Sequence, residues 1–260
     1  MKLLALFLLA SCSWGQFFPF PGPGKNHVTT SPGGTFTFDQ GVASDDGVTS
    51  GTSWTTCGAP GCTTGINIAS GETVVVTAGY NGGCTAGPTL TLTDSHGGNT
   101  YTQIGGATFG GTTMCISMWY AKNITGDSNM IWTVTYSSSI SFRAISVMSL
   151  TPTATTAVAL DQSVNGNSET PSAPVTTSSF TTTAADEILV IGSYDAGGFT
   201  ALNNFNSTNF TVPAGCKSST GVISMGYQIV TVTQSSATVT FTSQFGSGFA
   251  YTFGLKTFKD

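Results

Sequence analysis

The stretch Ile116–Tyr120 (ISMWY) recurs near the C-terminus as Ile223–Tyr227 (ISMGY). Successive side chains of a β-strand point to opposite faces, so Ile116, Met118 and Tyr120 share one face. The second copy repeats this apolar face residue for residue. The pattern therefore predicts two equivalent strands, each with this face directed towards a hydrophobic core.

The same two-residue alternation of apolar and hydroxyl side chains runs through most of the chain, which is typical of half-buried strands. Pairs of glycines separate the alternating segments and mark turns. No segment carries the apolar stripe and caps of a helix. We therefore expect an all-β protein with essentially no helix after the N-terminal leader. The clearest further strands are Thr73–Ala78, Thr89–Thr93, Ile131–Tyr136, Ile188–Ser193, Val222–Val232 and Ala237–Thr242.

The internal repeat is longer than one strand. Gly71–Val76 (GETVVV) resembles Asp186–Ile191 (DEILVI), so residues 66–152 and 181–260 share a strand plan. Either each copy is a small sandwich, or the two copies are pseudo-repeated halves of one larger, jelly-roll-like antiparallel β-sandwich. We favour the second arrangement, because a segment of about 85 residues buries only a thin core on its own.

The N-terminus resembles an export signal. A short apolar segment follows Lys2, and small residues follow that segment. Two cleavage sites compete: one after Gly15, and one before Cys12, where the sequence resembles a lipobox that would leave Cys12 lipidated. We therefore divide the chain into a signal peptide (1–15), a Pro/Gly-rich spacer (16–33) and a β-sandwich domain (34–260).

Composition excludes several functional classes. Charged residues make up 7% of the chain, and Lys plus Arg total only seven. Such a surface cannot neutralise many phosphates, so nucleic acid is not an expected partner. No apolar run after residue 16 approaches the ~20 residues needed for a transmembrane helix. Arg143 is the only arginine, and we expect it at the surface.

Six cysteines in an exported chain indicate disulfides rather than a redox or metal site. Cys57 and Cys62 flank a tight Pro/Gly turn, which predicts a local bridge. A second bridge is expected between Cys84, which follows one strand, and Cys115, which begins another. Cys216 is then left over, and the sequence alone does not fix the connectivity.

The segment Asp94–Tyr101 (DSHGGNTY) contains an aspartate, a serine and a histidine within three positions. Adjacent residues on a turn rarely converge as a catalytic triad. We therefore interpret Asp94 and Asn99 as residues that hydrogen-bond to their own turn. The alternative is a Ca²⁺ ion held by Asp94, Asn99 and backbone carbonyls. No other cofactor is expected.

Aromatic side chains are the candidates for ligand binding. Trp119 points away from the apolar face of its strand, and Trp54 lies in a Thr/Gly-rich region. Both indole rings are candidates for stacking on sugar rings. Because sandwiches have two packed sheets, the alternative is that a loop covers Trp119.

Two glutamates occupy equivalent positions at strand starts in the two copies, Glu72 and Glu187. Paired carboxylates are typical of glycosidases. Equivalent positions in a repeat are more simply explained as one structural corner used twice. We therefore name no catalytic residue.

Three stretches carry a resemblance to a known class of proteins: Leu92–Tyr101, Trp119–Ile124 and Thr181–Val190. There the chain resembles uncharacterised bacterial secreted β-sandwich domains found in surface and adhesion proteins. The resemblance covers roughly residues 35–260 and implies a binding or structural role, with no activity attached. The additional cysteines of this chain depart from it.

These observations favour a non-enzymatic module, secreted or anchored to the cell surface, that binds polysaccharide or another surface. The first alternative is a polysaccharide hydrolase or lyase on a jelly-roll scaffold. The second is a self-assembling structural protein, because uncharged Thr-rich strands lack the edge charges that normally block association.

Overall fold

The structure is a computed structural model of the 260-residue chain. It describes residues 36–47, 49–58, 61–105, 109–110, 112–152, 158–168, 175–195, 210–220, 222–241 and 251–259. The expected signal peptide, the spacer and Cys12 lie outside the described residues. Within them, no helix is long and apolar enough to cross a membrane.

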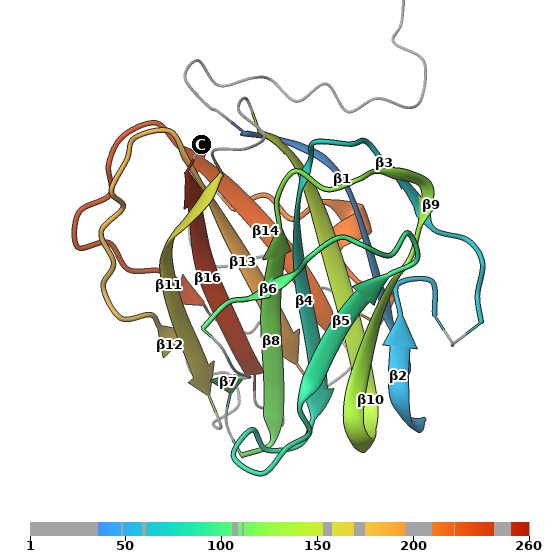
Figure 1. Ribbon diagram of the computed structural model, residues 1–260. Coiled ribbons are helices and arrows are strands. Elements are labelled where there is room, and N and C mark those ends of the chain that lie inside the picture. Colours follow the sequence, from blue (N-terminus) through green and yellow to red (C-terminus); the bar gives the residue numbers. More distant parts are fainter. Residues whose placement is uncertain are drawn as a thin grey trace, which may run out of the picture.

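The first sheet contains eight strands, and its main path runs β1-β10-β4-β8-β6 (Figure 1). Strands β2 and β5 pair with the first part of β10, and β7 pairs with β8. All pairings are antiparallel. The strands are β1 (Phe36–Asp45), β2 (Ser50–Thr55), β4 (Thr73–Asn81), β5 (Leu90–Asp94), β6 (Thr102–Gln103), β7 (Phe109–Gly110), β8 (Met114–Ala121) and β10 (Trp132–Pro152).

The second sheet has four strands in the order β11-β16-β13-β14. They are β11 (Ala159–Ser168), β16 (Tyr251–Lys259), β13 (Glu187–Asp195) and β14 (Ile223–Val230). Two small ribbons complete the structure, one of β3 (Ile66–Ile68) with β9 (Asp127–Met130) and one of β12 (Val175–Thr176) with β15 (Thr240–Phe241). The only helical element among the described residues is the 3-10 turn η1 (Ala214–Cys216).

The two copies of the repeat have the same strand order and the same register. Strands β1, β10, β4 and β8 correspond in order to β11, β16, β13 and β14. Gln40 pairs with Ser149 in the first sheet, as Gln162 pairs with Thr257 in the second. A bulge precedes each glutamine in its strand. The predicted all-β sandwich is confirmed. Each layer also contains a strand that precedes the predicted bounds of its repeat, β1 before residue 66 and β11 before residue 181.

The two layers pack against each other through equivalent strands. Strand β8 contacts β13 and β16, and reciprocally β14 contacts β4 and β10. At one end of this interface the Phe38 and Tyr227 rings stack with centroids 5.6 Å apart. At the other, Tyr120 packs on Phe258 at 5.4 Å. The core between the layers is centred on Val75, Met118, Met148, Leu150, Ile188, Val190, Met225 and Phe258.

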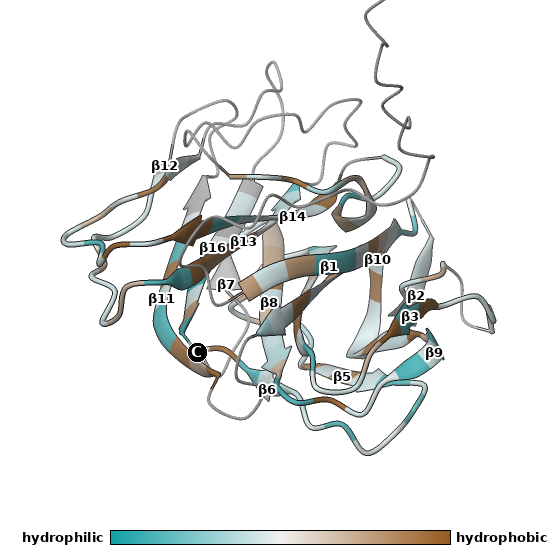
Figure 2. Cartoon of the chain, turned by 90° about the horizontal axis from the view of Figure 1, so that it is seen from above, coloured by the Kyte–Doolittle hydropathy of each residue, from teal (hydrophilic) through white to brown (hydrophobic). Residues whose placement is uncertain are grey.

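The first sheet is buried on both faces. The long strand β10 continues past the inner layer and folds over it, carrying β2 and β5 along (Figures 1 and 2). A second core fills the space between this folded-over part and the inner strands of the first sheet. Strand β4 accordingly has the nearly continuous apolar sequence of a strand covered on both sides, and all of its residues except Asn81 are buried. The second core contains Trp54, Val74, Val76, Ala78, Leu90, Trp119, Trp132, Val134, Tyr136, Ile145 and Val147.

Candidate functional site

The two tryptophans proposed as a sugar-stacking surface are both buried. Trp119 is 3% exposed and Trp54 is 7% exposed. The alternation correctly placed Trp119 on the face opposite Met118, because these residues belong to different core clusters. That opposite face is covered by the folded-over part of the first sheet. The expected aromatic platform is therefore wrong for both residues, and their indole rings serve the second core.

Trp54 also covers a buried ion pair that the sequence did not predict. Arg143, expected at the surface, lies with its guanidinium carbon 5.3 Å from the centre of the Trp54 ring. Its Nε donates to Asp46 Oδ2 at 2.5 Å, and its Nη1 donates to the Ser53 carbonyl at 2.5 Å. The side chains of Arg143 and Asp46 are only 5% and 0% exposed. The only arginine of the chain therefore stabilises the fold rather than a surface site.

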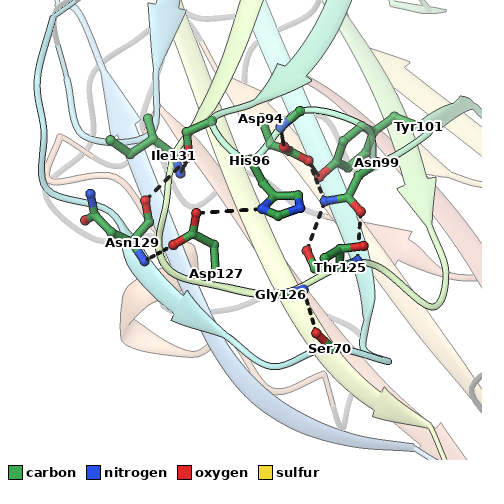
Figure 3. A network of polar contacts seen from close by, with 12 residues as sticks. Ser70, Asp94, His96, Asn99, Tyr101, Thr125, Gly126, Asp127, Asn129 and Ile131 are labelled. Atoms are coloured by element: carbon green, nitrogen blue, oxygen red, sulfur yellow. Dashed lines mark hydrogen bonds and ion pairs between the residues drawn. The ribbon is translucent and has the colours of Figure 1, made fainter.

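Asp94 organises its turn through hydrogen bonds (Figure 3). Its Oδ1 accepts the Gly97 amide at 2.8 Å, and its Oδ2 accepts Asn99 Nδ2 at 2.9 Å and the Tyr101 hydroxyl at 2.7 Å. The Tyr101 hydroxyl in turn accepts Trp132 Nε1 at 2.7 Å. Asp94 therefore hydrogen-bonds its own turn, as predicted, and it also links that turn to the second core, which was not predicted.

Asn99 joins this turn to the segment after β8. Its Oδ1 accepts the Thr125 amide at 2.8 Å, while its Nδ2 also donates to the Thr125 carbonyl at 3.1 Å (Figure 3). Beside it, His96 Nδ1 lies 3.9 Å from Asp127 Oδ2. Donors already occupy the oxygens of Asp94 and Asn99 that were proposed for Ca²⁺. The described residues contain no group of three or more His, Cys, Asp or Glu side chains with metal-binding geometry.

Both expected disulfides are present. Cys57 and Cys62 are bridged with their Cα atoms 6.0 Å apart, and Cys84 and Cys115 with theirs 5.3 Å apart. Cys216 is a fully buried thiol in the core between the layers. Burial raises the pKa of this thiol well above its usual value, so Cys216 remains an unreactive thiol.

Glu72 forms the first of two matching corners. It is 5% exposed, accepts a hydrogen bond from the Ser149 hydroxyl, and contacts the side chain of Asp39 at the bulge of β1. Burial raises the pKa of Glu72, and the charge of Asp39 adds to this effect. We call Asp39, Glu72 and Ser149 the first corner.

Glu187 forms the second corner with Asp161 and Thr257, at the equivalent positions of the second sheet. Ala184 donates its amide to Glu187 Oε1 at 2.9 Å, and burial raises the pKa of Glu187. The second corner also contains a cation, because Lys259 Nζ lies 3.2 Å from Asp161 Oδ1. Each glutamate thus pairs with the aspartate of its own sheet, which explains the repeat as a structural corner used twice.

A surface pocket of about 430 Å³ lies where β4 ends. Three separate chain segments form it: the end of β4 with its following loop, Thr112 before β8, and the middle of β10. None of the described residues that line it is charged. The lining residues are Tyr80, Gly82, Gly83, Thr85, Ala86, Gly87, Pro88, Thr112, Ser138 and Ile140.

Tyr80 is the unusual member of this pocket. It is 1% exposed, and its hydroxyl has no hydrogen-bond partner among the residues that the structure describes. Leaving such a group buried and unpaired costs about 1–3 kcal/mol. Burial raises the pKa of Tyr80 to about 12, so the hydroxyl keeps its proton and remains a donor. Because this hydroxyl is itself buried, a ligand acceptor can pair with it only if the loop that covers it shifts.

A disulfide fixes the loop that lines the pocket, and a glycine allows that loop to approach Tyr80 closely. Cys84 lies in the middle of the lining segment, and its bridge to Cys115 fastens that segment to β8. Gly87 lies directly over Tyr80, since a Cβ atom there would be 2.0 Å from the Tyr80 hydroxyl oxygen. Only glycine permits this close approach, so the loop fits tightly over the hydroxyl.

Sequence reasoning missed this pocket. Tyr80 gives no distinct signal, because the second copy also has a tyrosine near the end of its strand, Tyr194, and a repeated position is typical of a structural residue. The other lining residues are small and ordinary, and they come together only through the fold. No protein-family model matches the chain, and neither a curated protein nor a solved structure matches it.

Proposed function

We propose that this protein is a non-enzymatic module of the cell exterior that binds a neutral glycan in the Tyr80 pocket. The observation that carries the proposal is the unpaired, buried hydroxyl of Tyr80 in a pocket without charged side chains. A pocket of this size falls in the range used for small-molecule ligands. Sugars supply the hydroxyl acceptors that such a donor lacks.

The remaining lining residues support a sugar ligand. Thr85, Thr112 and Ser138 provide hydroxyl groups, whereas Pro88 and Ile140 provide an apolar wall for the CH face of a sugar ring. The glycines leave backbone groups accessible to further hydrogen bonds. An acidic ligand would find no lining cation, so neutral polysaccharides are the expected class.

The chemistry of the chain supports a location outside the cytoplasm. The N-terminus resembles an export signal, and two disulfides link cysteines of the described domain. Disulfides persist in oxidising compartments and are rare in the cytosol. A secreted form and a form anchored through a lipid on Cys12 would both present the pocket to extracellular glycans.

Substitutions at two neighbouring serines test whether the glycan binds in this pocket. Both Ser138 and Ser139 are exposed, but only Ser138 lines the pocket. Ser138→Trp fills the pocket and should weaken binding to a panel of neutral polysaccharides at least tenfold in isothermal titration calorimetry. Ser139→Trp adds the same indole ring outside the pocket and should bind like the parent protein.

Each result of this comparison is informative. If the parent protein binds no neutral polysaccharide of the panel, the proposed function is wrong. If it binds and both tryptophan variants bind equally well, the glycan site lies elsewhere on the surface. A further variant, Tyr80→Phe, should weaken binding while leaving the free energy of unfolding unchanged or higher, because the lost hydroxyl makes no bond in the free protein.

A further inference from the structure

The equivalent registers of the two sheets allow a direct comparison of one buried position. In the first sheet Met148 of β10 pairs with Gly41 of β1. In the second sheet Lys256 of β16 occupies the place of Met148, and it pairs with Ser163 of β11. Asn165 lies two residues further along β11, where β1 has only an alanine. The fold is therefore built once with apolar residues at these positions and once with polar ones.

Lys256 is an unusual residue for such a position. It is 0% exposed, although its counterpart shows that methionine satisfies the same packing. Taking an ammonium group out of water is unfavourable, and the neutral amine is the form that burial favours. Burial lowers the pKa of Lys256 to about 7, so a large fraction of the side chain is a neutral, nucleophilic amine at neutral pH.

Two of the groups that contact this amine are a carboxamide and a hydroxyl. Lys256 Nζ lies 2.6 Å from Asn165 Oδ1 and 2.8 Å from Ser163 Oγ. Asn165 and Ser163 are themselves exposed, so the carboxamide lies between the buried amine and the solvent. The amine thus contacts the one type of neutral side chain that can acylate it.

We propose that Lys256 and Asn165 form an intramolecular isopeptide bond that covalently joins β16 to β11. The proposal rests on the short contact between the two side chains, on the burial of the amine, and on the apolar residues at the equivalent positions of the first sheet. It is independent of the glycan pocket.

The reaction is a transamidation that needs no co-reactant. The lone pair of Lys256 Nζ attacks the Asn165 side-chain carbonyl carbon, and a new C–N bond forms there. The bond from that carbon to Nδ2 breaks, and Nδ2 leaves as ammonia with a proton lost by Nζ. Ser163 Oγ contacts Nζ and is placed to relay this proton. Because Asn165 is exposed, the ammonia has a path to solvent.

The bond would reinforce the edge of the second sheet. Within the described residues β11 pairs only with β16, so hydrogen bonds along one side alone hold it in the sheet. A covalent link at Asn165 would prevent β11 from separating even when those hydrogen bonds open.

Mass spectrometry of the folded full chain, produced with its export signal, tests the proposal. After reduction of its two disulfides, the parent protein should weigh about 17 Da less than its sequence after any leader removal, which is the mass of the ammonia released. Protease digestion should yield one branched peptide joining a β11 fragment to a β16 fragment. Lys256→Met, which copies the residue of the first sheet, and Asn165→Ala should both restore the full mass.

Two outcomes would overturn the inference. The first is a parent protein of full mass with separate β11 and β16 fragments. The second is a mass deficit that persists in Lys256→Met, because Asn165 precedes Gly166 and can lose ammonia by closing an imide on its own backbone. Neither outcome requires the variants to be as stable as the parent, since the mass of the parent and its fragments is decisive.

Discussion

The two sheets share strand order and register, yet they differ in the partners that surround their buried polar groups. The first sheet is covered on both faces and hides the Arg143–Asp46 ion pair beneath Trp54. Its corner contains two carboxyl groups and no cation among the described contacts. The corner of the second sheet has the same two carboxyl groups together with Lys259.

This difference shows which features the strand plan itself requires. The bulge aspartate, the buried glutamate and the hydroxyl on the central strand occur in both copies, so they belong to the fold. The Arg143–Asp46 ion pair belongs to the first copy, and Lys259 belongs to the second. Each therefore stabilises polar groups of its own sheet and is not part of the shared strand plan. The following variants separate these two kinds of interaction.

The largest effect is expected at the buried ion pair. Arg143→Met removes the cation and leaves the Asp46 carboxylate buried without it, which costs about 3–5 kcal/mol. Burial already raises the pKa of Asp46 against the opposing effect of Arg143, so the lone carboxyl should take up a proton more readily. Urea denaturation measures the loss of stability.

The matched control removes both partners. The double variant Arg143→Met with Asp46→Leu should recover most of the lost free energy of unfolding, because apolar pairs often replace buried ion pairs without loss. A double variant as unstable as the single one would show that Arg143 acts through its contacts with Trp54 and the Ser53 carbonyl instead.

An intermediate effect is expected at the corner glutamates, whose pKa values are raised by burial. The pKa of Glu72 is raised in the fold, so its contribution is complete below the unfolded-state value of about 4.3 and is lost as the pH rises through the folded-state pKa. In Glu72→Gln the side chain stays uncharged at every pH, so this loss of stability at higher pH does not occur. It should therefore be more stable than the parent at pH 7 and no more stable than the parent at pH 4.

Glu187→Gln provides the comparison between corners. The pKa of Glu187 is also raised by burial, but Lys259 offsets negative charge at the second corner. We expect the same sign at pH 7 and a smaller gain than for Glu72→Gln. Thermal unfolding of both variants across this pH range measures the difference, and equal gains would show that Lys259 does not distinguish the corners.

The smallest effect is expected for Lys259→Met. The lysine side chain is 37% exposed, so its ion pair with Asp161 is screened and should contribute less than about 1 kcal/mol. Burial alone would raise the pKa of Asp161, but hydrogen bonds from Thr183 and Lys259 lower it to about 2. The variant should raise this pKa, measurable by carbon NMR titration. An unchanged value would assign the lowering to the hydrogen bonds from Thr183 and Gln162.

The sequence predicted several strands, among them β4, β8, β13 and β14, because these depend on local alternation, but it did not single out β1, β11 or β16. Both disulfides were expected from the positions of their cysteines, although the sequence alone did not fix the connectivity. It also predicted that Asp94 organises its own turn, since its partners Gly97, Asn99 and Tyr101 lie a few residues away.

The sequence could not predict what covers the outer face of the first sheet. Alternation assigned Trp119 to a face, but its burial depends on β10 folding over with β2 and β5. The burial of Arg143 has the same origin. The pocket escaped prediction because its residues come from three segments, and only the fold shows that the Tyr80 hydroxyl lacks a partner.

Strand β10 belongs to both parts of the first sheet: its beginning pairs with β2 and β5, and its end pairs with β1 and β4. A force that pulls the outer part away must therefore act on the same strand that anchors the inner part. The outer part cannot peel off as a separate unit. Under mechanical tension we expect this half of the protein to rupture in one step.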